Sequence, residues 1–312
     1  MNKLNLTNID TTLLEAVADN GNAEIGKGAF SLRKNGKSVF INNTPNITIV
    51  PKKDLPGIDI YFRAETKGET MRMPVVVTEE DINDMVYNDF YVGKNADVTI
   101  VSGCGIHNDG NKDSVHNGIH RYYLEEGARV LYKEKHYGEG SGEGKRILNP
   151  ESEVHLGKNA YMEMDTVQIK GVDSTIRSTT GVLEDGASLI VKEKIMTHGY
   201  QSAETRFDVQ LNGKDSRVQV TSRSVATENS TQKFVSKVYG NNECFGHVEC
   251  DAIIKDNAKI ISIPEIIANN IDANLIHEAA IGKIAGAQIV KLMTLGLTEE
   301  EAEQEIINGF LK

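Results

Sequence analysis

The sequence contains fewer basic than acidic side chains. Its 312 residues include 34 lysines and arginines against 45 aspartates and glutamates, which leaves a formal net charge of −11. A protein with this balance repels phosphate backbones and anionic lipid. We therefore expect neither a nucleic acid nor a membrane surface to be its main partner.

Long apolar runs and a disulfide framework are also missing. No stretch approaches the ~18 apolar residues of a spanning helix, and the first twenty residues carry acids but no basic-then-apolar signal-peptide pattern. The three cysteines, at positions 104, 244 and 250, are an odd number in a long acidic chain. We expect free thiols rather than disulfides, and a soluble cytoplasmic protein.

One phrase recurs along the middle of the chain: a polar or glycine turn, a small residue, then alternating apolar side chains. The small residue stands at Ala96, Ala128, Ala160, Ala187, Ser216 and Ala258, at intervals of 27 to 42 residues. The period-two alternation after it predicts strands, and helix-period stretches are missing from about 90 to 265. We favour a β-solenoid of stacked coils over a large β-sandwich, because sandwich loops need not resemble one another.

Helical patterns occur only near the two ends. Residues 11–19 predict a short helix capped at position 10 or 11, and after Pro264 an apolar stripe from Ile281 to Met293 predicts another. Thr298 and Glu301 form a capping box for a last helix. The expected organisation is a helical segment at 1–24, a β-helix core at 25–265 and a helical region at 266–312. The terminal helices can pack on the solenoid, cap it or dock a partner.

Motifs for nucleotide hydrolysis, zinc proteolysis and serine hydrolysis are absent from the sequence. The remaining side chains that can bind metals lie in the C-terminal third, at Cys244, His247, Cys250, His277 and Glu278. Thiolate and imidazole are the ligands that iron and iron–sulfur clusters favour. Cys244, His247 and Cys250 also have the spacing of a local zinc half-site, but a structural zinc site needs four ligands and only three are present. Packed or solvent-facing side chains therefore remain an open alternative.

Several motifs in a fixed order resemble the SufB/SufD family of iron–sulfur cluster assembly scaffolds. They are Cys250-Asp251, Pro264, HEAAIGKI at 277–284, Gly296-Leu297, Glu301-Ala302 and Asn308-Gly309-Phe310. Upstream, Ser102-Gly103-Cys104 resembles the Gly-Cys element of the family, and His120 lies in the region that follows it. The chain looks like a short, minimal form of the SufB type, and it departs from the family pattern at Ile276 and Leu295.

The resemblance implies a right-handed parallel β-helix flanked by helices, a homodimer formed through the β-helix, and C-terminal helices that dock a SufC-type ABC ATPase. It further implies that Cys250 accepts sulfur or anchors a transient iron–sulfur cluster, with His277 and Glu278 assisting and Cys104 as a further candidate. The apolar side chains Ile306 and Phe310 are the expected docking contacts. A sulfur donor and apo-protein acceptors would be the other partners.

A scaffold of this kind is not itself an enzyme, since ATP hydrolysis belongs to the partner subunit. The alternatives are a β-solenoid carbohydrate-active enzyme and a purely structural interaction module. The absence of tryptophan and an aromatic content of only 6% disfavour the first of these. No residue pattern in the chain decides for or against a bound flavin.

Overall fold

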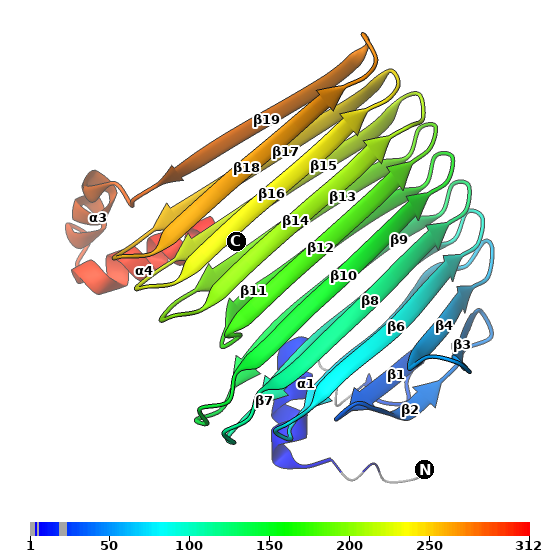
Figure 1. The fold of residues 1–312 in the computed structure, drawn as a ribbon, viewed down its shortest axis with the longest axis horizontal. Helices are drawn as coiled ribbons and strands as arrows, with labels where there is room; N and C mark the ends of the chain where they lie inside the picture. Colours follow the sequence, from blue (N-terminus) through cyan, green and yellow to red (C-terminus); the bar gives the residue numbers. More distant parts are fainter. Residues whose placement is uncertain (1–3, 5, 19–23) are drawn as a thin grey trace.

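The structure is a computed structural model that describes residues 4, 6–18 and 24–312. Its strands form two long sheets that face each other (Figure 1). The ten-stranded sheet runs in the order β19 (Ala273–Gly282), β17 (Cys244–Ile254), β15 (Ser216–Ala226), β13 (Ser188–Thr197), β11 (Tyr161–Lys170), β9 (Arg129–Glu139), β7 (Asp97–His107), β5 (Lys67–Val77), β1 (Ala29–Lys34) and β2 (Lys37–Asn42). The nine-stranded sheet runs in the order β18 (Lys259–Ala268), β16 (Thr231–Gly240), β14 (Ser202–Leu211), β12 (Ser174–Leu183), β10 (Arg146–Leu156), β8 (Ser114–Leu124), β6 (Asn83–Val92), β4 (Gly57–Phe62) and β3 (Ile47–Pro51).

From β4 onward the chain alternates between the two sheets, and each strand pairs in parallel with the strand two places along. This is a parallel β-solenoid, which confirms the predicted fold class and excludes an antiparallel sandwich. Inward-facing side chains from both sheets form one continuous core between them, from Ile47 near one end to Cys250 near the other. Each coil buries its apolar face against the next coil rather than within itself.

Five of the six small residues that mark the repeat lie at one corner of the solenoid, in successive coils. Ala96, Ala128, Ala160 and Ala187 directly precede β7, β9, β11 and β13, and all four are buried. Ser216 begins β15 and pairs with Cys244, which therefore occupies the same corner in the next coil. Ala258 precedes β18 in the opposite sheet, so the interval of 42 residues before it joins two different corners.

The N-terminal end of the solenoid is closed by the antiparallel pairs β1–β2 and β3–β4 and is flanked by α1 (Asn8–Val17). Val17 and Leu13 of this helix lie directly over Gly103 and Gly105 of β7. A Cβ atom at Gly103 would collide with the helix backbone, and one at Gly105 would crowd the Leu13 side chain. The predicted helix exists but begins earlier than expected. Its N-cap is Thr7, and Asp10 is the third residue of the capping box rather than the cap.

Strands extend further toward the C-terminus than the sequence pattern indicates. Pro264 lies within β18, and Ile281 lies in β19 rather than in a helix. Proline is tolerated there because β18 is an edge strand with a single neighbour, β16. The helical region consists of α3 (Gly286–Met293) and α4 (Glu299–Phe310), and the capping box at Thr298 is confirmed.

Within the described part of the chain, no helix has both the length and the apolar character needed to cross a membrane.

Candidate functional site

Cys250 faces the interior of the solenoid near its C-terminal end. In β17 the side chains of Cys244, Val248 and Cys250 alternate inward, and Cys250 is only 1% exposed. Burial raises the pKa of its thiol, and a hydrogen bond with Ser262 of β18 acts in the opposite direction. The resting thiol is therefore protonated at neutral pH.

His277 faces the same interior from β19, the last strand. It pairs with Val248, and its Nδ1 lies 3.1 Å from the Val248 carbonyl oxygen. Because a carbonyl oxygen can only accept, Nδ1 carries the proton and the Nε2 lone pair is left for a ligand. Burial and the neighbouring His247 lower the pKa of His277, so its ring is neutral at pH 7. A neutral imidazole of fixed orientation is the form that binds metals.

The residue of β19 beside Cys250 is an alanine, whose side chain is a single methyl group. The register pairs Cys250 with Ala279, which is exposed, while His277 lies two residues away on the same inward face. No strand follows β19 in its sheet. The thiol is thus buried in a single chain, yet it lies one strand below an open end of the solenoid.

Glu278 lies on the opposite face of the sheet from both of these residues. It pairs with Glu249, its side chain is 65% exposed, and its carboxylate lies 3.8 Å from His247 Nε2. Adjacent residues of a strand point to opposite sides, so His277 and Glu278 cannot share one ion within a chain. Among the described residues, no group of three or more His, Cys, Asp or Glu side chains has metal-binding geometry.

The spacing of residues 244–250 does not form a half-site either. Cys244 and Cys250 point inward, whereas His247, an odd number of residues from both, points outward. Cys244 serves as the small residue of a buried corner. Its thiol pKa is raised by burial.

Cys104 belongs to a different part of the molecule. It lies in β7, five strands from β17 in the same sheet, which corresponds to about 24 Å at about 4.8 Å per strand. It packs in a separate buried cluster with Ile106 and Val75. Burial and the nearby Glu134 carboxylate raise the pKa of its thiol well above the usual value.

The sequence reasoning missed a line of polar side chains that runs inside the solenoid toward Cys250. Successive strands of one sheet place them in register, at Ser102, Glu134, Thr166, Glu193, Ser222 and Cys250. Ser222 and Thr205 each donate to the Glu193 carboxylate over 2.9 Å. The signal was present, since each polar residue occupies an inward position of an alternating strand.

Arg177 of the facing sheet holds this buried line together. Its guanidinium pairs with Glu134 and lies 3.6 Å from Glu193. Burial by itself would raise the pKa of Glu134, but Arg177 and His136 lower it well below its usual range. The outcome differs at Glu193, where burial outweighs Arg177 and raises the pKa.

The last coil presents apolar side chains to solvent. Ile266 and Ile281 are 44% and 39% exposed, and Ile261 and Ile263 of β18 are exposed as well. Edge strands with unpaired backbone groups and apolar side chains are a template for association. The geometry is therefore one thiol and one imidazole near an apolar, uncovered end.

Sequence comparisons identify the relatives of this chain. A family model described as SUF system FeS cluster assembly, SufBD core domain, matches residues 79–310. The chain belongs to the SufBD family. An iron–sulfur cluster assembly SufBD family protein of Pyrococcus horikoshii, PH0883, is 31% identical over 284 residues, which cover 88% of this chain and 84% of that protein.

Two further SufBD relatives match the chain with different identity and coverage. The family protein MJ0034 of Methanocaldococcus jannaschii is 25% identical over 92% of this chain and 91% of its own length. The iron–sulfur cluster assembly protein SufB of Bacillus subtilis is 31% identical over 99 residues, only 30% of this chain and 21% of that protein. Membership of the family supports a role in SUF-type iron–sulfur cluster assembly.

His120, in the region that follows the Ser102-Gly103-Cys104 element, leads to a prediction about how stability depends on pH. It is buried beside Phe90 and Tyr132, and burial lowers its pKa to about 4. The unfolded chain binds this proton near pH 6.5. Stability from the neutral ring is therefore complete above about pH 6.5 and is lost as the pH falls toward 4.

We expect this one group to contribute about 2 kcal/mol to the fall in unfolding free energy between pH 7 and pH 5. The measurement is urea unfolding of the wild type and of His120→Gln at both pH values. The variant should start less stable but lose less on acidification. Equal losses in the two proteins would contradict the assignment.

Proposed function

We propose that this SufBD protein is a scaffold subunit of a SUF-type complex that accepts sulfur and iron and builds a nascent iron–sulfur cluster together with a SufC-type ABC ATPase. The observation that carries the proposal is the shared inward direction of Cys250 and His277, one strand apart, at the open end of the solenoid. The nascent cluster is the cargo of this site. It leaves for apo-protein acceptors.

The chemistry of the two side chains suits iron. A thiolate and a neutral imidazole are both strong iron ligands. Because the thiol is protonated at rest, binding of iron must displace its proton, so iron loading should release acid. Sulfur reaches Cys250 from a donor protein past the small Ala279 side chain.

Two ligands do not complete the shell of an iron ion, so the site needs a second surface. We propose that two copies meet through the exposed last coil, at β18 and β19, and bring two such ends together. A symmetric contact of this kind would cover the unpaired edge strands. Glu278 on the outer face then contributes across the dimer rather than within its own chain.

The scaffold needs no catalytic apparatus, and we propose that all ATP hydrolysis takes place in the partner. A reducing compartment, the cytoplasm, suits the three cysteines, none of which is in a disulfide.

We assign the ATPase contact to α3 rather than to α4. In α4, Ile307 is buried against Val225, as is the C-cap residue Leu311, and Phe310 packs on the same cluster. By contrast, α3 has no buried residue. Its Val290 and Met293 are 60% and 43% exposed, and Leu295, just after the helix, is 76% exposed. An amphipathic helix with an uncovered apolar side is suited to helix-in-groove docking.

The first test concerns the cargo. After anaerobic reconstitution with iron and sulfide, Cys250→Ser and His277→Ala should lose most of their iron, sulfide and absorption above ~400 nm, because each removes a ligand. Cys244→Ser is the matched control and should load like the wild type. A full cluster in Cys250→Ser would refute the assignment.

The second test concerns the dimer. Light scattering should give about twice 34.3 kDa for the wild type. Ile266→Asp should shift the protein to a monomer, because it places a charge in the proposed contact. A wild type that stays monomeric at all concentrations would rule out the homodimer.

The third test concerns the ATPase. Val290→Asp combined with Met293→Asp should abolish co-purification with the ATPase and leave the melting temperature unchanged, because neither side chain is buried. Phe310→Asp should instead lower the melting temperature by several degrees, since Phe310 packs on the solenoid (about 1–3 kcal/mol). Normal ATPase binding by the α3 double variant would place the contact elsewhere.

A further inference from the structure

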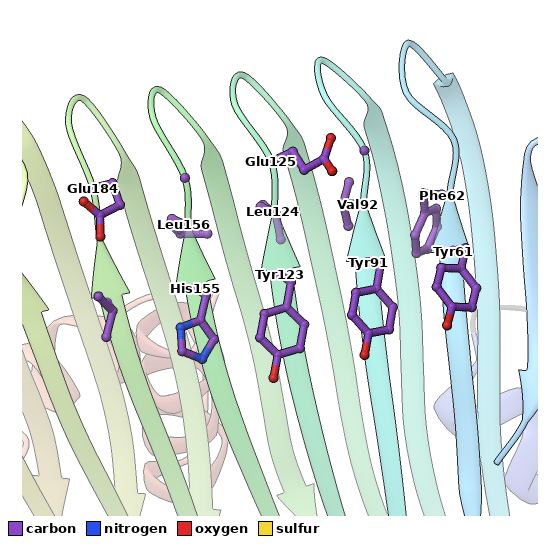
Figure 2. A pocket seen from close by; sticks show the side chains of 13 residues that line it. Tyr61, Phe62, Tyr91, Val92, Tyr123, Leu124, Glu125, His155, Leu156 and Glu184 are labelled. Carbon is purple, nitrogen blue, oxygen red and sulfur yellow. The ribbon is translucent and has the colours of Figure 1, made fainter. Parts of the chain in front are cut away.

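A groove of about 460 Å³ lies on the outer face of the nine-stranded sheet, far from the last coil. Its wall is a row of aromatic rings at equivalent positions of four successive strands: Tyr61, Tyr91, Tyr123 and His155 (Figure 2). These rings are nearly parallel, with angles of 8° to 13° between neighbours. Their centroids are 5.0 to 5.3 Å apart, which is the spacing of the strands.

Neighbouring rings do not cover one another completely, and the tyrosines are open to solvent. Fully overlapping rings in contact are separated by about 3.5 Å, and the centroids of these rings are farther apart than that. Tyr61 is 45% exposed and Tyr91 is 36% exposed. None of this aromatic surface serves the core, which lies on the other side of the sheet.

Two carboxylates stand at the turn side of the groove, above the rings (Figure 2). Glu184 makes no side-chain hydrogen bond or ion pair with any residue that the structure describes. Glu125 uses one oxygen to accept the Lys94 backbone N–H over 2.8 Å. The Lys94 ammonium group attracts Glu125 at longer range, but its ion pair is with Glu126, over 2.7 Å.

The charges below the rings are also acidic on balance. Lys52 is bound by both Asp59 and Asp89, and Arg121 lies between Asp89 and Glu153. Three acids therefore face two bases. Together with Glu125 and Glu184, they give the groove a net negative charge that favours a cationic occupant.

The strand positions of Glu125 and Glu184 define that occupant. Glu125 follows β8 and Glu184 follows β12, two strands along the sheet, so their backbones are about 10 Å apart. A peptide in the polyproline II conformation advances about 3.1 Å per residue with three residues per turn, so side chains three positions apart lie on the same face and are about 9 Å apart. Guanidinium groups stack on aromatic faces and pair with carboxylates through two hydrogen bonds.

We propose that this groove binds a segment of a partner protein in the polyproline II conformation, with two arginines three residues apart. The segment would lie across β4 to β12. Its arginine stems would pack over the tyrosine rings, and its guanidinium groups would reach Glu125 and Glu184. The surface is separate from both the cluster site and α3.

The test uses a fluorescein-labelled peptide with an Arg-x-x-Arg core and fluorescence anisotropy with the full chain at low salt. Two comparison peptides have adjacent arginines or have both arginines replaced by glutamine. We expect the Arg-x-x-Arg peptide to bind at least threefold more tightly than the adjacent pair, because only its spacing reaches both carboxylates. The glutamine peptide should not bind measurably.

Variants of the chain distinguish specific binding in the groove from non-specific attraction to an acidic protein. Glu184→Gln should weaken binding about threefold and Tyr91→Ala by a similar factor, with unchanged circular dichroism. Glu143→Gln is the matched control, because it removes one exposed acid from a turn at the opposite ends of the strands. Equal affinity of the two arginine peptides, or equal weakening by Glu184→Gln and Glu143→Gln, would overturn the proposal in favour of non-specific attraction. Absence of binding by all peptides would also overturn it.

Discussion

The in-register stacking of parallel strands is the constraint on which the rest of this structure depends. Each coil repeats the inward and outward alternation of the coil before it, so a side chain's face follows from its register alone. The line from Glu193 through Ser222 to Cys250 illustrates this, with each residue paired to the next. A slip of one residue in β19 would send His277 outside and Glu278 inside.

The same constraint explains how charged groups survive inside the solenoid. An isolated buried charge is strongly unfavourable, and removal of one partner leaves the other uncompensated. Arg177 meets this condition because the register brings Glu134 and Glu193 of two different strands to it from across the interior. The buried polar line is therefore a property of several coils together, and no single coil could hold it.

The two ends of the solenoid differ in how they are covered. The N-terminal end is closed by antiparallel pairs and flanked by α1, whereas β18 and β19 leave backbone edges and isoleucines uncovered. Cys250 and His277 lie at the uncovered end. Under the proposed function this asymmetry gives the site the access that loading and release of cargo need, while the rest of the core is closed.

Much of this architecture could be predicted from the sequence. Alternation and recurring small corner residues predicted the solenoid, Thr298 with Glu301 predicted the start of α4, and an ordered set of motifs indicated the SufBD family. Each of these signals lies within a few neighbouring residues, where backbone geometry and capping act directly. Cys250 and His277 were likewise singled out from local motifs.

Only the tertiary structure decided which of these residues meet. It placed Glu278 on the outer face, made Cys244 a buried corner, and made β18 an edge strand that accepts Pro264. It also stacked Tyr61, Tyr91 and Tyr123, about 30 residues apart in sequence, into one wall. The physical reason is that these relations depend on the register between coils. That register is set by contacts between residues distant in sequence, so it cannot be deduced from any short segment.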